Sequence, residues 1–263
     1  MRNLLYVFLV ILLFNACGNG DGGGASEGVN SGGQGGSMAR FAVVGDYLYT
    51  VDYNELKMFD ISDAAKPAYL PSKNQTLGGD AETIFPLDTL LFIGSQTGML
   101  IYDISRPDFP NLLAHETHIK SCDPVVSDGR FAYVTLNSEN TFCGRSSNEL
   151  LVYDLKNITK PELIHTVSNL YAPRGLGILA DKLYVCDNGL KVFDISDPAV
   201  KAPVWIGDLS HIPSLRTLDA YDVIPLADSK IILLIGADGL YELDTNGEKL
   251  SLVGSIEVKR TNR

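Results

Sequence analysis

An apolar five-residue string that ends in aspartate recurs five times after residue 50. Within each string the apolar residues stand next to one another instead of alternating with polar ones. Adjacent apolar positions are typical of strands that are covered on both faces. The five strings span residues 56–60, 99–103, 150–154, 190–194 and 240–244.

Two shorter strand-like pieces precede each string and a fourth piece follows it, so the pattern predicts four strands per unit. The first two pieces are joined by a turn that contains an aspartate, and these turns recur 40 to 53 residues apart, at Asp46, Asp88, Asp128, Asp181 and Asp228. Repeated strand units of this length are typical of β-propellers, because one small sheet cannot bury both of its faces alone. We therefore predict an all-β protein, a five-bladed β-propeller of four-stranded blades over residues 38–263.

The ends of the array are predicted to meet. We expect the N-terminal strand at residues 40–44 to pair with the C-terminal sheet, residues 231–258, and so complete the last blade. Such closure removes the exposed strand edges that promote aggregation.

The N-terminal residues predict export. Arg2 is followed by an apolar run over residues 4–14, which is too short to span a bilayer and is typical of a signal peptide over residues 1–16. The pair Ala16 and Cys17 resembles the lipobox of bacterial lipoproteins, which implies lipidation of Cys17, although Phe14 and Asn15 depart from that motif. The alternative is an ordinary cleaved signal that leaves a free thiol. Residues 17–37 would then form the lipidated cysteine and a flexible, glycine-rich tether.

The charge of the chain narrows the classes of partner. The net charge is −11, and no stripe of basic residues is present, which argues against nucleic acid and against direct attraction to anionic lipids. Membrane attachment is therefore expected through the lipid anchor only. Four histidines and four cysteines are scattered along the chain, so we expect neither a metal site nor a cofactor. The aspartates that end the strings are expected to start Asx turns.

The sequence Asp-Ile-Ser follows three of the strings, at residues 60–62, 103–105 and 194–196. Together with the strings, it resembles the LVIVD repeat family of bacterial propeller lipoproteins over residues 38 to about 258. The resemblance implies a propeller fold and a Bacteroidetes-type lipoprotein of the outer membrane, either periplasmic or exposed at the cell surface. It implies little about activity.

Five charged residues stand where the first strand of each unit begins. By analogy with WD-repeat propellers, these strands are taken as innermost, so their starting residues should surround the mouth of the central channel: Arg40, Glu82, Asp123, Arg174 and Asp222. A concave surface with convergent polar groups is a typical ligand site. The alternative is that these side chains are solvated and pair with one another.

The cysteines near the middle of the chain are predicted to lie on the same face. Cys122 precedes an innermost strand and Cys143 belongs to an insertion at residues 136–148, so a disulfide could hold the insertion near the mouth. Two independent thiols are the alternative. Cys186 stands in an apolar strand and is expected to be a small buried residue.

Two hypotheses of function follow. The first is a membrane-anchored binding or scaffolding module that uses the channel mouth for an unknown protein or glycan partner at the cell envelope. The second is a carbohydrate-active hydrolase with its acid and base among Glu82, Asp123 and Asp222. No common catalytic motif occurs in the predicted propeller. Units of 40 to 50 residues are short for five-bladed glycosidases, and no aromatic platform is evident near the carboxylates, which favours binding.

Overall fold

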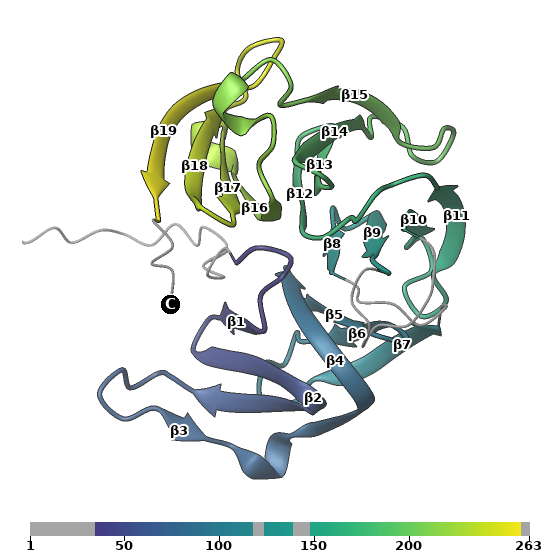
Figure 1. Ribbon diagram of the computed structural model, residues 1–263. Coiled ribbons are helices and arrows are strands. Elements are labelled where there is room, and N and C mark those ends of the chain that lie inside the picture. The colour runs from purple at the N-terminus through teal and green to yellow at the C-terminus, as the bar shows by residue number, and fades with distance from the viewer. Residues whose placement is uncertain (1–34, 118–123, 139–147, 259–263) are drawn as a thin grey trace, which may run out of the picture. The chain divides into compact units, whose positions relative to one another are not determined.

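The computed structural model describes residues 35–117, 124–138 and 148–258, and these residues form an all-β protein of antiparallel sheets (Figure 1). The predicted signal peptide, Cys17 and most of the tether lie outside the described residues, as do Cys122, Asp123 and Cys143. No helix in the described ranges is long and apolar enough to cross a membrane.

Three sheets each contain four strands in sequence order, as predicted. The first contains β8 (Val125–Ser127), β9 (Phe131–Leu136), β10 (Glu149–Asp154) and β11 (Glu162–Val167). The second contains β12 (Leu176–Leu179), β13 (Lys182–Cys186), β14 (Leu190–Asp194) and β15 (Val204–Asp208). The third contains β16 (Ala220–Leu226), β17 (Ile231–Gly236), β18 (Gly239–Asp244) and β19 (Ser251–Glu257). Short 3₁₀ turns, η2 (Pro213–Leu215) and η3 (Ala227–Ser229), lie in the connections before and after β16.

The first two repeat units are fused into one seven-stranded sheet. Its strands are β1 (Phe41–Val44), β2 (Tyr47–Asp60), β3 (Ala68–Tyr69), β4 (Gln75–Leu87), β5 (Leu90–Ser95), β6 (Gly98–Asp103) and β7 (Asn111–Thr117), with the 3₁₀ turn η1 (Pro71–Lys73) before β4. The start of β4 pairs with β2 and its remainder pairs with β5. Gly78, Gly79 and Asp80 all have positive φ angles, so the chain turns between the two parts of β4 without leaving the sheet.

The turn chemistry read from the sequence is present. Each aspartate that ends a string accepts a hydrogen bond at Oδ1 from the backbone N–H two residues later, at 2.6–2.9 Å, and these aspartates are Asp60, Asp103, Asp154, Asp194 and Asp244. The predicted Asx turns are therefore confirmed. Lys201 and Ser196 donate to Asp194 and lower the pKa of that carboxyl to about 2.

The second and third strings are buried on both faces, as their pattern predicts, whereas buried and partly buried positions alternate in the first and fifth strings. Phe92 and Ile101 of the seven-stranded sheet share one apolar cluster with Val134 of β9, and Val152 of β10 shares another with Leu183 of β13. The first strands of neighbouring sheets also contact each other, β4 with β8, β8 with β12 and β12 with β16. Burying a large apolar side chain contributes roughly 1.5–3 kcal/mol, so these shared clusters join successive sheets.

The predicted pairing of the N-terminal strand is wrong. β1 pairs with the start of β2, from Phe41 opposite Thr50 to Val44 opposite Tyr47, and not with residues 231–258. The last sheet supplies its own fourth strand, Ser251–Glu257, although no proline precedes that strand as one does in the other units. No position in that sheet is therefore left for the N-terminal strand to fill.

Candidate functional site

Asp222 holds the N-terminal segment against the last sheet by side-chain hydrogen bonds. Its carboxylate is 7% exposed and accepts from Ser37 Oγ at 3.1 Å and from the Met38 backbone N–H at 3.3 Å. The N–H of Val223 donates to the same carboxylate at 3.0 Å. Burial raises the pKa of Asp222 to about 6, and these hydrogen bonds offset only part of that effect.

Ser37 joins the segment to a second sheet as well. Its hydroxyl oxygen accepts from the Leu176 N–H of β12 at 2.7 Å, while the carbonyl of Ala39 accepts from Ile84 of β4 at 2.9 Å. A Cβ atom on Gly36 or Gly175 would clash with the Asp222 carboxylate, so both positions need glycine. Residues 36–39 therefore contact the first strands of three units.

Arg174 lies beside this segment and takes part in a mixed polar and aromatic cluster. Its Nη1 is 2.6 Å from Asp219 Oδ1, and its guanidinium carbon is 5.0 Å from the centroid of the Tyr221 ring. The side chain of Asp219 is 55% exposed, so solvent screens this ion pair. The backbone N–H of Gly175 donates to the carbonyl of Tyr221, which joins the loop before β12 to the start of β16.

A buried carboxylate positions the loop that precedes Arg174. Asp187 is fully buried and accepts from the backbone N–H groups of Tyr171 and Ala172, at 2.9 and 2.6 Å from Oδ1. Lys191 Nζ lies 2.5 Å from the other carboxylate oxygen and balances its charge. The loop is thus held in place while the ring of Tyr171 stays 64% exposed.

These groups surround a cavity of about 200 Å³, which we call the mouth pocket. It is lined by Tyr171, Arg174, Asn188, Thr217 and Asp219, together with Ala172, Leu218 and Ala220. In such an arrangement the exposed aromatic ring can stack on a ligand, while the arginine and the carboxylate can form hydrogen bonds with it. The arrangement suits recognition of a polar partner.

The structure brings together only part of the predicted ring of charges. Arg174 lies next to Gly175, which in turn contacts Asp222, but Asp222 is occupied by the N-terminal segment. Glu82 accepts from Gln96 Nε2 at 3.0 Å. Arg40 lies with its guanidinium carbon 5.6 Å from the centroid of the Tyr53 ring.

Several residues that line the mouth pocket or contact its lining were not predicted. Tyr171 lines the pocket and is 64% exposed, and Tyr221, which is 36% exposed, lies against Arg174, yet neither was among the predicted site residues. The position of Asp187 at a turn could have been recognised in the sequence, because this residue comes directly before the tight turn at Asn188 and Gly189, both of which have positive φ. Nothing in the sequence marked Asp219 as a site residue, since it stands in a connection without a repeat pattern.

The sequence contains LVIVD repeats. The model of the LVIVD repeat family matches residues 35–72 and 179–204, which include the first and the fourth strings. This match confirms the repeat type that the sequence resembles. No curated protein matches the chain.

Solved structures of similar fold include lactonases. A periplasmic gluconolactonase of Pseudomonas aeruginosa, PpgL, is 16% identical, with a TM-score of 0.58 over 81% of this chain and 68% of that chain. A putative 6-phosphogluconolactonase from Bacteroides uniformis is 14% identical, with a TM-score of 0.62 over 83% of this chain and 70% of that chain. A functionally unknown protein from Desulfotomaculum acetoxidans is 10% identical, with a TM-score of 0.62 over 83% of this chain and 69% of that chain.

Likeness at these identities shows the fold alone. The chain thus combines LVIVD repeats with four-stranded antiparallel sheets that match β-propeller-like lactonase structures.

Proposed function

We propose that this protein is an exported, lipid-anchored binding or scaffolding module that uses the mouth pocket to hold a protein or glycan partner at the cell envelope. We place the anchor at Cys17 and the protein in the outer membrane. We also propose that the repeat units close into a ring of five blades, in which the contact between Ser37 and Asp222 joins the first unit to the last.

One observation supports a binding role over a catalytic one: the carboxylates proposed for hydrolysis already accept hydrogen bonds from other parts of the chain wherever the structure describes them. Arg174 pairs with Asp219, Glu82 is held by Gln96, and Asp222 accepts hydrogen bonds from the N-terminal segment. A hydrolase needs carboxylates that are open to substrate, one able to donate a proton and one able to act as base or nucleophile. The raised pKa of Asp222 results from burial, and Ser37 and Met38 donate hydrogen bonds to its carboxylate.

The alternative remains a carbohydrate-active hydrolase with Glu82, Asp123 and Asp222 as candidate carboxylates. Two solved structures of similar fold are named as lactonases. The burial of Asp222 makes this alternative the weaker one.

The test is capture of partners by the full-length protein on intact cells. We compare the unmodified chain with Arg174→Ala and Tyr171→Ala, which alter the mouth pocket. Arg130→Ala is the matched control, because Arg130 also pairs with an aspartate, Asp154, at 2.8 Å, but lies in the turn before β9 and does not line the pocket.

Loss of the same captured partner in both pocket variants, with retention in the control, supports the proposal. Unchanged capture in all three variants contradicts it. Labelling of the chain with palmitate, lost in Cys17→Ala, tests the anchor separately.

A further inference from the structure

A second cavity, of about 230 Å³, lies between the sheet β12–β15 and the loop that precedes β19. We call it the outer pocket and define it by six of its polar residues: Lys182, Tyr184, Asp208, His211, Glu248 and Lys249. It shares no lining residue with the mouth pocket. Nothing in the proposed binding role requires it.

The most unusual group in the outer pocket is the hydroxyl of Tyr184. The residue is 0% exposed, and its hydroxyl oxygen has no hydrogen-bond partner among the residues that the structure describes. Buried polar atoms are nearly always paired, so an unpaired hydroxyl at the wall of a cavity indicates a partner that enters the cavity. Burial raises the pKa of Tyr184 to about 12, so the hydroxyl keeps its proton at neutral pH.

The first repeat shows what this tyrosine does when the chain itself supplies a partner. Tyr49 and Tyr184 each stand three residues after an aspartate, Asp46 and Asp181, whose carbonyl accepts a bond from the isoleucine after the string. The hydroxyl of Tyr49 donates to the carbonyl of Pro107 at 2.6 Å. The two tyrosines therefore occupy the same place in their units, and only the hydroxyl of Tyr49 has a hydrogen-bond partner among the described residues.

The difference arises from the loop of the next unit. Pro107 belongs to residues 104–110, a seven-residue loop between β6 and β7 that contains two prolines. The loop at the outer pocket, residues 245–250 between β18 and β19, has six residues and no proline. The shorter loop offers Tyr184 no carbonyl, and a cavity remains where that loop would otherwise pack.

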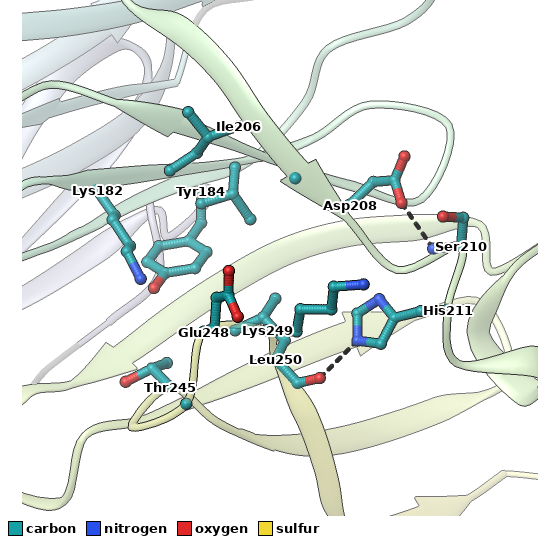
Figure 2. A pocket seen from close by; sticks show the side chains of 13 residues that line it. Lys182, Tyr184, Ile206, Asp208, Ser210, His211, Thr245, Glu248, Lys249 and Leu250 are labelled. Atoms are coloured by element: carbon teal, nitrogen blue, oxygen red, sulfur yellow. Dashed lines mark hydrogen bonds between the residues drawn. The ribbon is translucent and has the colours of Figure 1, made fainter.

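The charges around the cavity are balanced. Lys182 and Lys249 carry positive charge, whereas Asp208 and Glu248 carry negative charge (Figure 2). Asp208 Oδ1 already accepts from the N–H of Ser210 at 2.8 Å. A pocket with both signs in equal number favours a ligand without net charge, whose groups both donate and accept hydrogen bonds.

Hydroxyl groups meet that requirement, and the size of the cavity limits their number. His211 Nε2 donates to the carbonyl of Leu250 at 2.7 Å, so its Nδ1 is left to accept from a ligand when the ring is neutral. Figure 2 shows the hydroxyl of Tyr184 and the amine of Lys182 on the same side of the cavity. Typical small-molecule sites measure about 300–1,000 Å³, so only a small molecule fits here.

We propose that the outer pocket binds an uncharged polyhydroxylated molecule of about monosaccharide size, with the Tyr184 hydroxyl bonded to one of its hydroxyl groups. Val192 and Ile206 supply apolar wall for the carbon skeleton. The outer pocket is separate from the mouth pocket, so loss of binding at one pocket does not imply loss of binding at the other.

The experiment titrates the full-length chain with glucose, galactose and mannose and measures binding by saturation-transfer NMR. Inorganic phosphate and acetate are titrated as anionic probes. At least one sugar should bind saturably, and neither anion should displace it. Tyr184→Phe should lower the affinity for that sugar by roughly fivefold or more, because one buried hydrogen bond is lost.

Tyr49→Phe is the matched control and should leave the affinity unchanged, as should Arg174→Ala at the mouth pocket. Lys182→Met provides a second pocket variant should Tyr184→Phe fail to fold. Failure of all three sugars to bind, equal affinity in Tyr184→Phe or Lys182→Met, or displacement by phosphate or acetate would overturn the proposal.

Discussion

The first and fourth repeats match the same family model, yet their surroundings give them different properties. Each contains an aspartate paired with a nearby lysine, Asp52 with Lys57 within β2 and Asp187 with Lys191 across the turn between β13 and β14. The side chain of Asp52 is 57% exposed, whereas that of Asp187 is 0% exposed and also binds the loop before Arg174. Similar local patterns thus differ in burial and in hydrogen bonding because different segments pack on them.

The two repeats should differ most in the free energy of unfolding that is lost when these aspartates are replaced. Asp187→Ala leaves Lys191 and two backbone N–H groups without their carboxylate, and loss of a buried ionic partner costs about 3–5 kcal/mol. Asp52→Ala removes a screened surface pair and should cost no more than about 1 kcal/mol. Urea denaturation of both variants measures the difference, and equal losses would show that the two repeats are energetically alike.

The contact that joins the first repeat to the last sheet should depend on pH. Because burial raises the pKa of Asp222 to about 6 in the folded protein, from about 3.9 in the unfolded chain, the folded state binds the proton more tightly. The stabilisation is complete below about pH 4 and is lost as the pH rises through about 6. The loss amounts to at most about 3 kcal/mol, since one pKa unit corresponds to about 1.4 kcal/mol.

The comparison with Asp222→Asn isolates this effect from other titrating groups. The free energy of unfolding of the unmodified protein, minus that of the variant, should fall between pH 4 and pH 7. A difference that stays constant over this range would show that Asp222 does not titrate there.

A smaller difference in the free energy of unfolding is expected when the equivalent tyrosines, Tyr49 and Tyr184, are replaced by phenylalanine. Tyr49→Phe loses the hydrogen bond to Pro107 and should lower the free energy of unfolding by about 1 kcal/mol. Tyr184→Phe removes a hydroxyl that has no partner in the described part of the chain, and should be neutral when no ligand is added. Thermal unfolding of both variants tests this, and a larger loss in Tyr184→Phe would refute the contrast.

Local features of this fold could be predicted from the sequence because each depends on a few neighbouring residues. The strings, the turns at Asp88 and Asn188 and the Asx turns all follow from apolar pattern or from turn chemistry. Four strands per unit followed in the same way for the three separate sheets.

Long-range features could not be predicted. Ser37 and Asp222 are 185 residues apart, and no sequence pattern links them. The continuous β4 fuses two units through Gly78 and Gly79, which look like an ordinary turn in the sequence. Among the predicted mouth residues, Arg174 lines a cavity because Asp219 and Tyr171 meet it from connections that lie outside the repeat pattern.

The bond between Ser37 and Asp222 also sets an order of events during synthesis. Ser37 is made before any of the described strands, while its acceptor belongs to the last sheet, so the segment can complete its contacts only after β16 has been made. A chain that ends before β16 leaves that serine without its acceptor. The hydrogen bond from the first described residues to the last sheet therefore requires that synthesis has passed Asp222.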